Sequence, residues 1–255
     1  MADPLNGAVA IEPGGPSALF GRRGLVPVYE RLAHLDTLDY SERTLWSETS
    51  HDEINPRQRL IGEARRIAAV PDDSYDALLA SHVLEHLADP LGALAEWQRV
   101  VRAGGHVLLV MPHRDGTFDH RRPVTSLDHL RADAERETGE DDLTHLPEIL
   151  ELHDLERDPG AIDREVFEQR CRDNPSSRAM HHHVFDSRAV VELCRAAGLV
   201  VLAIRPARPF NIFCLCRVEG DGDSGVEDDG DSGVEDHELA KILARSPFES
   251  DRTAA

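Results

Sequence analysis

Long apolar runs, lysine and aromatic residues are all scarce in this sequence of 255 residues. No stretch approaches the roughly 20 apolar residues that are needed to cross a bilayer. The first residues include Asp3 and Glu12 rather than a basic, apolar leader. We therefore expect a cytoplasmic protein without a membrane partner, and its length predicts a single domain with one sizeable core.

Basic residues are outnumbered, because 28 Lys and Arg face 48 Asp and Glu, giving a formal net charge of -20. This acidic protein would repel phosphate backbones, so nucleic acid is not an expected partner. Cysteines are few, and Cys171, Cys194, Cys214 and Cys216 lack the spacing of zinc sites. We expect buried thiols there and no metal.

Residues 75–113 carry the clearest pattern. Tyr75–Ser81 is a short apolar run after an acidic turn, which predicts a buried strand. Asp89 then offers a helix N-cap before a proline, and we expect the glycines at 104 and 105 to end that helix. His106–Met111 predicts a second buried strand. A strand, helix and parallel strand build an open sheet whose ligands bind at the carboxyl ends of the strands.

This stretch resembles the class I S-adenosylmethionine (SAM)-dependent methyltransferases. The matching residues are Tyr75-Asp76, the run Ser81-His82-Val83-Leu84-Glu85-His86, the helix from Asp89, and Gly104-Gly105 before the next strand. These residues are typical of the broad group of methyltransferases that methylate small molecules. The resemblance implies an α/β fold, namely a Rossmann-like, mostly parallel seven-stranded sheet with helices on both faces. It also implies SAM as the cofactor and a small-molecule acceptor.

The residues after the first predicted strand, Ala8–Ile11, match the family's glycine-rich turn in part. Glu12, Gly14 and Gly15 fit, but Pro16 replaces the last glycine, and the following helix is expected to be short. The resemblance assigns Glu12, Gly14 and Gly15 to cofactor binding. Glycine there lets the backbone approach the cofactor.

Acidic residues follow two further predicted strands. Asp36 closes Leu32–Asp36 and would accept hydrogen bonds from the ribose hydroxyls, although Asp39 competes for this role. Glu63 and Ala64 follow the third strand, where the family has a turn that contacts adenine. Ser81 and His82, at the end of the fourth strand, complete the expected cofactor site.

A helical insertion is expected over about 114–180, because this stretch is too long for a simple connection. Its predicted helices are 125–137, with Thr125 and Asp128 as a capping box, then 143–155 and 162–171. A helix capped by Asp186 and two antiparallel strands, 199–204 and 210–218, then complete the domain at residue 218.

Residues 219–255 are predicted to be an acidic, disordered tail. The motif DGDSGVED at 221–228 recurs unchanged at 229–236, and it cannot bury apolar surface. Residues 237–245 have the pattern of a short amphipathic helix. We expect a chain that ends at Val218 to keep its fold.

Histidines supply the candidate catalytic groups, because methyl transfer to a hydroxyl requires removal of a proton. His113 follows the fifth strand and is the preferred general base, with Asp115 orienting it; His82 is the other candidate. Arg114, His181, His182 and His183 are expected to line the acceptor pocket.

Two alternatives stay open. His113, Asp115, His120 and the run 181–183 are possible metal ligands, which would indicate a metal-dependent enzyme. The incomplete glycine turn allows a methyltransferase-like protein that binds a ligand without turnover. The sequence does not indicate the acceptor or the oligomeric state.

Overall fold

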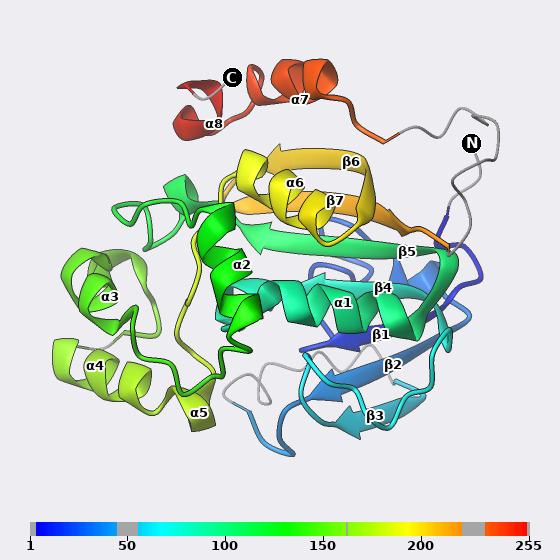
Figure 1. Ribbon diagram of the computed structural model, residues 1–255, viewed down its shortest axis with the longest axis horizontal. Helices are drawn as coiled ribbons and strands as arrows, with labels where there is room; N and C mark the ends of the chain where they lie inside the picture. The colour runs from blue at the N-terminus through cyan, green and yellow to red at the C-terminus, as the bar shows by residue number, and fades with distance from the viewer. Residues whose placement is uncertain (1–3, 45–55, 162, 221–232, 254–255) are drawn as a thin grey trace.

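The computed structural model describes residues 4–44, 56–161, 163–220 and 233–253. Seven strands form one sheet in the order β3-β2-β1-β4-β5-β7-β6 (Figure 1). The strands are β1 (Val9–Pro13), β2 (His34–Asp39), β3 (Gln58–Ile61), β4 (Tyr75–Ser81), β5 (Val101–Pro112), β6 (Leu199–Ala207) and β7 (Asn211–Val218). All neighbouring pairs up to β5 are parallel, and β7 is antiparallel to both β5 and β6. The predicted Rossmann-like sheet is confirmed.

The central unit is built as predicted up to the end of its helix. β4 covers the expected residues, and α1 (Pro90–Val100) begins where the Asp89 carboxylate accepts a hydrogen bond from the Gly92 amide. The prediction that Gly104 and Gly105 end α1 is wrong. The helix ends at Val100, and both glycines lie inside β5, where Gly104 has a φ of +74°.

Helices cover one face of the sheet. α1 and α6 (Ser187–Ala196) bury Trp97, Leu94 and Val190 against alternate strand residues such as Leu78 and Leu109. Asp186 caps α6 as expected, by accepting a hydrogen bond from the Ala189 amide. Each large side chain buried in such a core contributes about 1.5–3 kcal/mol.

The other face packs against residues 5–32. Phe20 and Val28 from this segment contact Leu79 and Val110 of the sheet. The segment was expected to contain a short α-helix, but among the described residues it holds turns and one 3₁₀ turn, Tyr29–Arg31. Gly21, Gly24 and Pro27 interrupt any helical run there, so the chain covers this face without a regular helix.

The insertion after β5 contains α2 (Leu127–Glu135), α3 (Leu146–Leu152), α4 (Arg164–Arg172) and α5 (Asn174–Ser177). Three of these were expected. The cap of α2 is Ser126 rather than Thr125, since Ser126 Oγ accepts from the His129 amide while Thr125 Oγ1 accepts from Val184. The insertion has a small apolar cluster of its own, formed by Leu146, Ile149, Phe167, Cys171 and Met180.

The end of the chain packs onto the domain, which corrects the predicted tail. α7 (Asp236–Leu243) and α8 (Glu249–Thr253) lie beside β6 at the edge of the sheet (Figure 1). Val234, Leu239, Leu243 and Phe248 are buried, the first three within the main core. A chain ending at Val218 would lose these contacts, so the expectation that it keeps its fold is not supported. Most of the acidic repeat, 221–232, lies outside the described residues.

None of the described helices is long and apolar enough to span a membrane.

Candidate active site

A cavity of about 1040 Å³ opens at the carboxyl ends of the parallel strands. Its wall is formed by residues 14–19, 37–40, 62–64, 81–83, 86–87 and 209–211, together with Leu25, Thr44, Pro56, Arg59 and Arg178. Four strand ends therefore meet at one opening, as expected for an open parallel sheet.

The glycine turn after β1 forms one wall of the cavity, as predicted for Gly14 and Gly15. Gly14 has a φ of +72°, and a Cβ there would lie 2.8 Å from Val83. A Cβ at Gly15 would lie 2.3 Å from the carboxyl carbon of Glu12. Both positions therefore require glycine, and Pro16 does not prevent the turn from forming.

Glu12 lies beneath this turn rather than in the cavity wall. It is fully buried, and its carboxyl accepts hydrogen bonds from the Ser17 amide at 3.0 Å and the Tyr29 hydroxyl at 2.6 Å. Burial raises the pKa of Glu12 to about 8, against the lowering effect of these bonds. A protonated Glu12 can donate to Tyr29, whose hydroxyl lies 3.1 Å from the Ser17 carbonyl. The three groups then satisfy one another and fix the turn.

The acidic residue at the end of β2 is Asp39, because the strand runs three residues beyond its predicted end. Asp39 lines the cavity and forms an ion pair with Arg59. Asp36 was predicted for this position, but it lies within the strand and is buried. Its carboxylate pairs with Arg57 and accepts from the Tyr75 hydroxyl at 2.9 Å, and it does not line the cavity.

The turn after β3 lines the cavity where the adenine contact was expected. Glu63 and Ala64 both belong to the wall. The Trp97 indole donates to the Ala64 carbonyl at 2.9 Å, and Arg178 pairs with Glu63 at 2.8 Å. The turn is thus fixed from the α1 side and from the insertion.

Ser81 and His82 also line the cavity, as predicted. His82 has a φ of +55°, a left-handed conformation that turns the chain sharply after β4. Its ring lies between two acceptors, Glu85 Oε1 at 3.4 Å from Nδ1 and Asn211 Oδ1 at 3.0 Å from Nε2. Burial alone would lower the pKa of His82, but Glu85 and Asn211 outweigh it and raise the pKa above the usual range.

His86 lies in the same wall, and its ring packs edge-on against His181. Burial and the neighbouring His181 lower the pKa of His86 to about 4, so its imidazole is neutral near pH 7. Glu85 is buried between these rings, and its carboxylate has no hydrogen-bond partner among the described residues. Its charge raises the pKa of His86, against the larger effect of burial.

His113 and Asp115, the predicted base and its partner, lie away from the cavity. The His113 ring is fully buried and stacks on Phe248 with the ring centroids 3.8 Å apart; its Nδ1 accepts from the Asp115 amide, and its Nε2 lies 3.1 Å from Asp251 Oδ1. Asp115 accepts a hydrogen bond from the Ser250 amide. Both residues bind the C-terminal segment, so the structure contradicts a role in proton removal.

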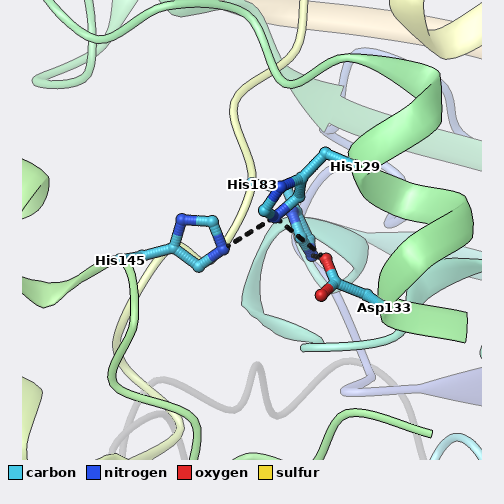
Figure 2. A group of neighbouring side chains, drawn as sticks. All are labelled: His129, Asp133, His145 and His183. Atoms are coloured by element: carbon cyan, nitrogen blue, oxygen red, sulfur yellow. Dashed lines mark hydrogen bonds and ion pairs between the residues drawn. The ribbon is translucent and has the colours of Figure 1, made fainter. Parts of the chain in front are cut away.

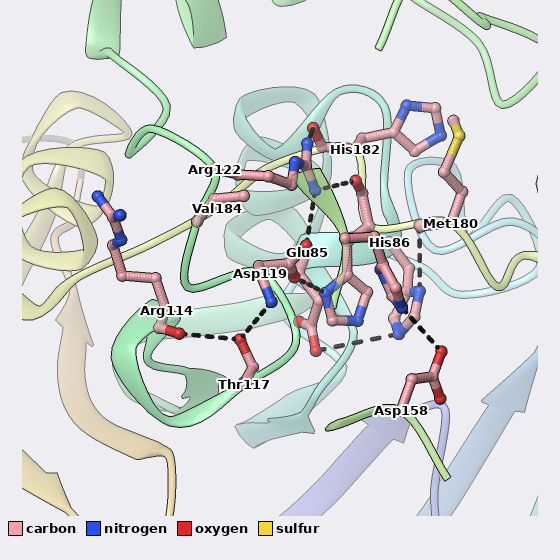
Figure 3. Close-up of polar contacts among 12 residues, drawn as sticks. Glu85, His86, Arg114, Thr117, Asp119, Arg122, Asp158, Met180, His182 and Val184 are labelled. Atoms are coloured by element: carbon pink, nitrogen blue, oxygen red, sulfur yellow. Dashed lines mark hydrogen bonds and ion pairs between the residues drawn. The ribbon is translucent and has the colours of Figure 1, made fainter. Parts of the chain in front are cut away.

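The four residues predicted to line the acceptor pocket do not border this cavity. Arg114 donates to the His120 carbonyl, and His181 pairs with Asp119 at 2.6 Å. His182 bonds to Asn174, and His183 lies 3.2 Å from the Ala88 carbonyl. Buried Arg122 holds the backbone of this histidine run by donating to the carbonyls of 181 and 182 (Figure 3).

Tyr40, His86, Arg178, Phe210 and Asn211 line the cavity but were not predicted as site residues. Phe210 and Asn211 come just before and at the start of β7, where the antiparallel pairing brings them beside the end of β5. The signal for these two residues in the sequence was a phenylalanine followed by an asparagine at the start of a predicted strand. Arg178 has a φ of +53° inside the insertion, which no local pattern indicated.

Part of the chain is similar to a known protein family. A family model described as a methyltransferase domain matches residues 21–109. No curated protein sequence is significantly similar to the chain.

Several solved structures are similar in fold. A chain in a complex that contains the Haloferax volcanii Trm112 methyltransferase activator has a TM-score of 0.51 at 13% identity, covering 85% of this chain and 84% of that chain. A SAM-dependent methyltransferase from Mesorhizobium loti has a TM-score of 0.49 at 13% identity, with 85% and 93% covered. One from Aquifex aeolicus has a TM-score of 0.46 at 12% identity, with 85% of each chain covered.

Proposed function

This chain carries a class I SAM-dependent methyltransferase domain, and we propose that it transfers a methyl group from SAM to a small-molecule acceptor. One observation carries the proposal. The glycine turn, Asp39, the Glu63-Ala64 turn and His82 come from four strand ends and border a single cavity.

The residues of the cavity fit the cofactor. Gly14 and Gly15 leave a concave backbone where any side chain would collide with Val83 or Glu12. Asp39 offers carboxylate oxygens for the two ribose hydroxyls. Ala64 offers a backbone amide to the adenine ring, and Ser81 and His82 reach the opposite wall.

SAM supplies a methyl group on a positively charged sulfur, which an acceptor atom displaces directly. The residues of the chain align the acceptor with that methyl group, and such alignment accounts for most of the rate. His82, His86, Phe210 and Asn211 form the wall available to the acceptor. His82 and Phe210 meet edge-on with centroids 5.6 Å apart, which gives the acceptor an aromatic boundary.

The size and charge of the molecule support a small acceptor. Pockets for small molecules measure roughly 300–1,000 Å³, and this cavity of about 1040 Å³ is large enough for a cofactor and a compact acceptor together. The net charge of -20 is unfavourable for a nucleic acid. An oxygen or nitrogen atom is the proposed methyl acceptor.

His82 is the proposed general base, in place of His113. It combines a position in the cavity wall with a carboxylate, Glu85, on its Nδ1 side. Proton removal from a hydroxyl or ammonium acceptor would use Nε2, which Asn211 now holds at 3.0 Å. An acceptor molecule that takes the place of Asn211 at Nε2 would meet a His82 ring that is already held in a fixed orientation.

Titration calorimetry with SAM and S-adenosylhomocysteine tests the proposal. We expect both to bind the folded chain with one site each. Absence of binding to folded protein would overturn the proposal. Binding without turnover across alcohols, phenols and amines would instead support a ligand-binding protein of the same fold.

A further inference from the structure

We propose that His129, Asp133, His145 and His183 form a zinc site that holds the helical insertion together. These four residues come from α2, from the residue before α3, and from the segment that returns to the sheet (Figure 2). The inference departs from the expectation of no metal. It concerns a different part of the molecule from the cavity, since none of the four residues lines it.

The distances match the edges of a coordination tetrahedron. Zinc binds nitrogen and oxygen ligands at about 2.0–2.2 Å, so two ligand atoms lie about 3.3–3.6 Å apart. His129 Nε2 is 3.1 Å from His145 Nε2 and 3.0 Å from Asp133 Oδ2. His183 Nε2 is 3.8 Å from Asp133 Oδ2, and all four ligand atoms lie within 4.8 Å of one another. Side-chain movements, including loss of the 3.2 Å contact between His183 Nε2 and the Ala88 carbonyl, would bring the four atoms to the ideal edges.

Asp133 is oriented toward the three histidines by its neighbours. Its Oδ1 accepts hydrogen bonds from Arg136 at 2.7 Å and Thr138 at 3.3 Å. Its Oδ2 faces the rings, is buried, and has no hydrogen-bond partner among the described residues despite its 3.0 Å approach to His129. A buried carboxylate oxygen left in this state is costly. A cation between the rings would satisfy it.

The spacing on α2 explains why two ligands converge. His129 and Asp133 are four residues apart, so they project from the same face of the helix. His145 meets them from across the insertion, and its ring lies edge-on to those of His129 and His183, with centroids 4.8 and 5.5 Å apart.

The ligand set favours zinc in a structural role. Three imidazoles and one carboxylate are ligands that zinc accepts, and the three nitrogen donors argue against the oxygen cages of Mg²⁺ or Ca²⁺. Four protein ligands leave no open position for water, which is the arrangement of structural rather than catalytic sites. The ion would join three segments of an insertion that otherwise has a small apolar cluster.

Metal analysis of untagged chain tests the site, with two glutamine variants compared. His145→Gln removes a ligand. His120→Gln is the matched control, since His120 lies in the same insertion but contacts Asp154 instead. After growth with added zinc, we expect about one zinc per chain in the wild type and in His120→Gln. We expect less than a tenth of that in His145→Gln.

Thermal unfolding gives a second measurement. Removal of the metal with a chelator should lower the wild-type Tm by roughly 5 °C or more, and added zinc should restore it. The Tm of His145→Gln should not respond to either treatment. Cobalt(II) should give the intense visible bands of a tetrahedral site in the wild type, which zinc abolishes.

The proposal is overturned if the wild type holds no more zinc than His145→Gln, or if its Tm ignores both chelator and zinc. Should His145→Gln fail to fold, the cobalt spectrum of the wild type decides alone. Cofactor calorimetry is a separate measurement, so failure of the metal site and failure of the proposed function are distinguishable.

Discussion

His113 Nε2 lies 3.1 Å from Asp251 Oδ1, and both side chains are fully buried. Asp251 also accepts hydrogen bonds from the hydroxyls of Ser187 and Ser246, at 2.7 and 2.6 Å. One carboxylate therefore connects the end of β5, the start of α6 and the segment before α8. The C-terminal helices are part of the domain through this contact.

Asp251→Ala should destabilise the chain without changing its affinity for SAM. Alanine would leave His113 Nε2 and the hydroxyls of Ser187 and Ser246 buried without their carboxylate, at a cost of about 1–3 kcal/mol for each unsatisfied group. We expect the Tm to fall by at least roughly 6 °C. Asp236→Ala is the control, since its ion pair with Arg195 is exposed and its loss should leave the Tm nearly unchanged. An equal Tm for both variants would contradict the structural role of Asp251.

Glu12→Gln should change how stability depends on pH. The pKa of Glu12 is raised from 4.5 in the unfolded reference to about 8 in the folded chain, so the folded state holds a proton that the unfolded state releases. This contribution is fully present below pH 4.5 and is lost as pH rises through 8. It amounts to roughly 5 kcal/mol.

Glutamine mimics the protonated carboxyl, so the variant should match the wild type at pH 4, below both pKa values, and exceed it in stability at pH 9. Urea unfolding at the two pH values measures the difference. Glu30→Gln, an exposed change on the same segment, should leave the pH dependence as it is. Parallel curves for Glu12→Gln and the wild type would show that Glu12 is ionised throughout.

Asp39→Asn should weaken SAM binding by at least about tenfold, roughly 1.4 kcal/mol. The variant loses a carboxylate that faces the cavity, and with it the charged acceptor for the ribose hydroxyls. Asp36→Asn is the matched comparison. It breaks the buried contacts with Arg57 and Tyr75, so it should lower the Tm while nearly preserving SAM affinity. If calorimetry instead showed weaker SAM binding for Asp36→Asn and nearly unchanged binding for Asp39→Asn, Asp36 would be the residue that binds the ribose.

His82→Asn should lower kcat by roughly 10²-fold or more, the usual scale for a positioned base. Asparagine is the chosen replacement because it tolerates the left-handed backbone at this position. SAM affinity should change by less than about tenfold. The control is His120→Asn, which lies away from the cavity. Full turnover in His82→Asn would leave alignment of the acceptor alone to explain the reaction.

The pH profile gives an independent test of His82. Because Glu85 and Asn211 raise the pKa of His82, the acid side of the activity profile should lie above the usual histidine range. Glu85→Gln removes the charge that stabilises the imidazolium, so the acid limb should move to lower pH. An unmoved limb would mean that another group titrates.

Local patterns predicted the elements whose ends are marked by neighbouring residues. β4, the cap of α1 at Asp89 and the cap of α6 at Asp186 were all found as expected. In each case an acidic residue and an apolar run stand side by side in the sequence. The end of β2 was misplaced because the polar pair Asp36-Thr37 stands inside the strand His34–Asp39, where it resembles a strand end.

The wrong predictions concern residues whose structure depends on contacts with residues distant in the sequence. His113 stands at the end of a central strand, where a catalytic residue is common, but Asp251 and Phe248 cover it. Because of the acidic repeat, all of residues 219–255 were predicted to be disordered, including the apolar residues that follow the repeat. Leu239 and Leu243 have helical spacing, and that signal was enough to predict a helix but not its docking on β6.

The packing of α7 and α8 also has a consequence for synthesis. Chains are made from the N-terminus at about 5–20 residues per second, and domains fold as units while they emerge. A nascent chain that has emerged as far as β7 already contains all seven strands, yet the Val201 carbonyl still lacks its hydrogen bond from the Val234 amide, and β6 lacks its contacts with α7. His113 likewise has no carboxylate partner until residue 251 has left the ribosome. We therefore expect the sheet to reach its final stability only after the C-terminal helices have been synthesised.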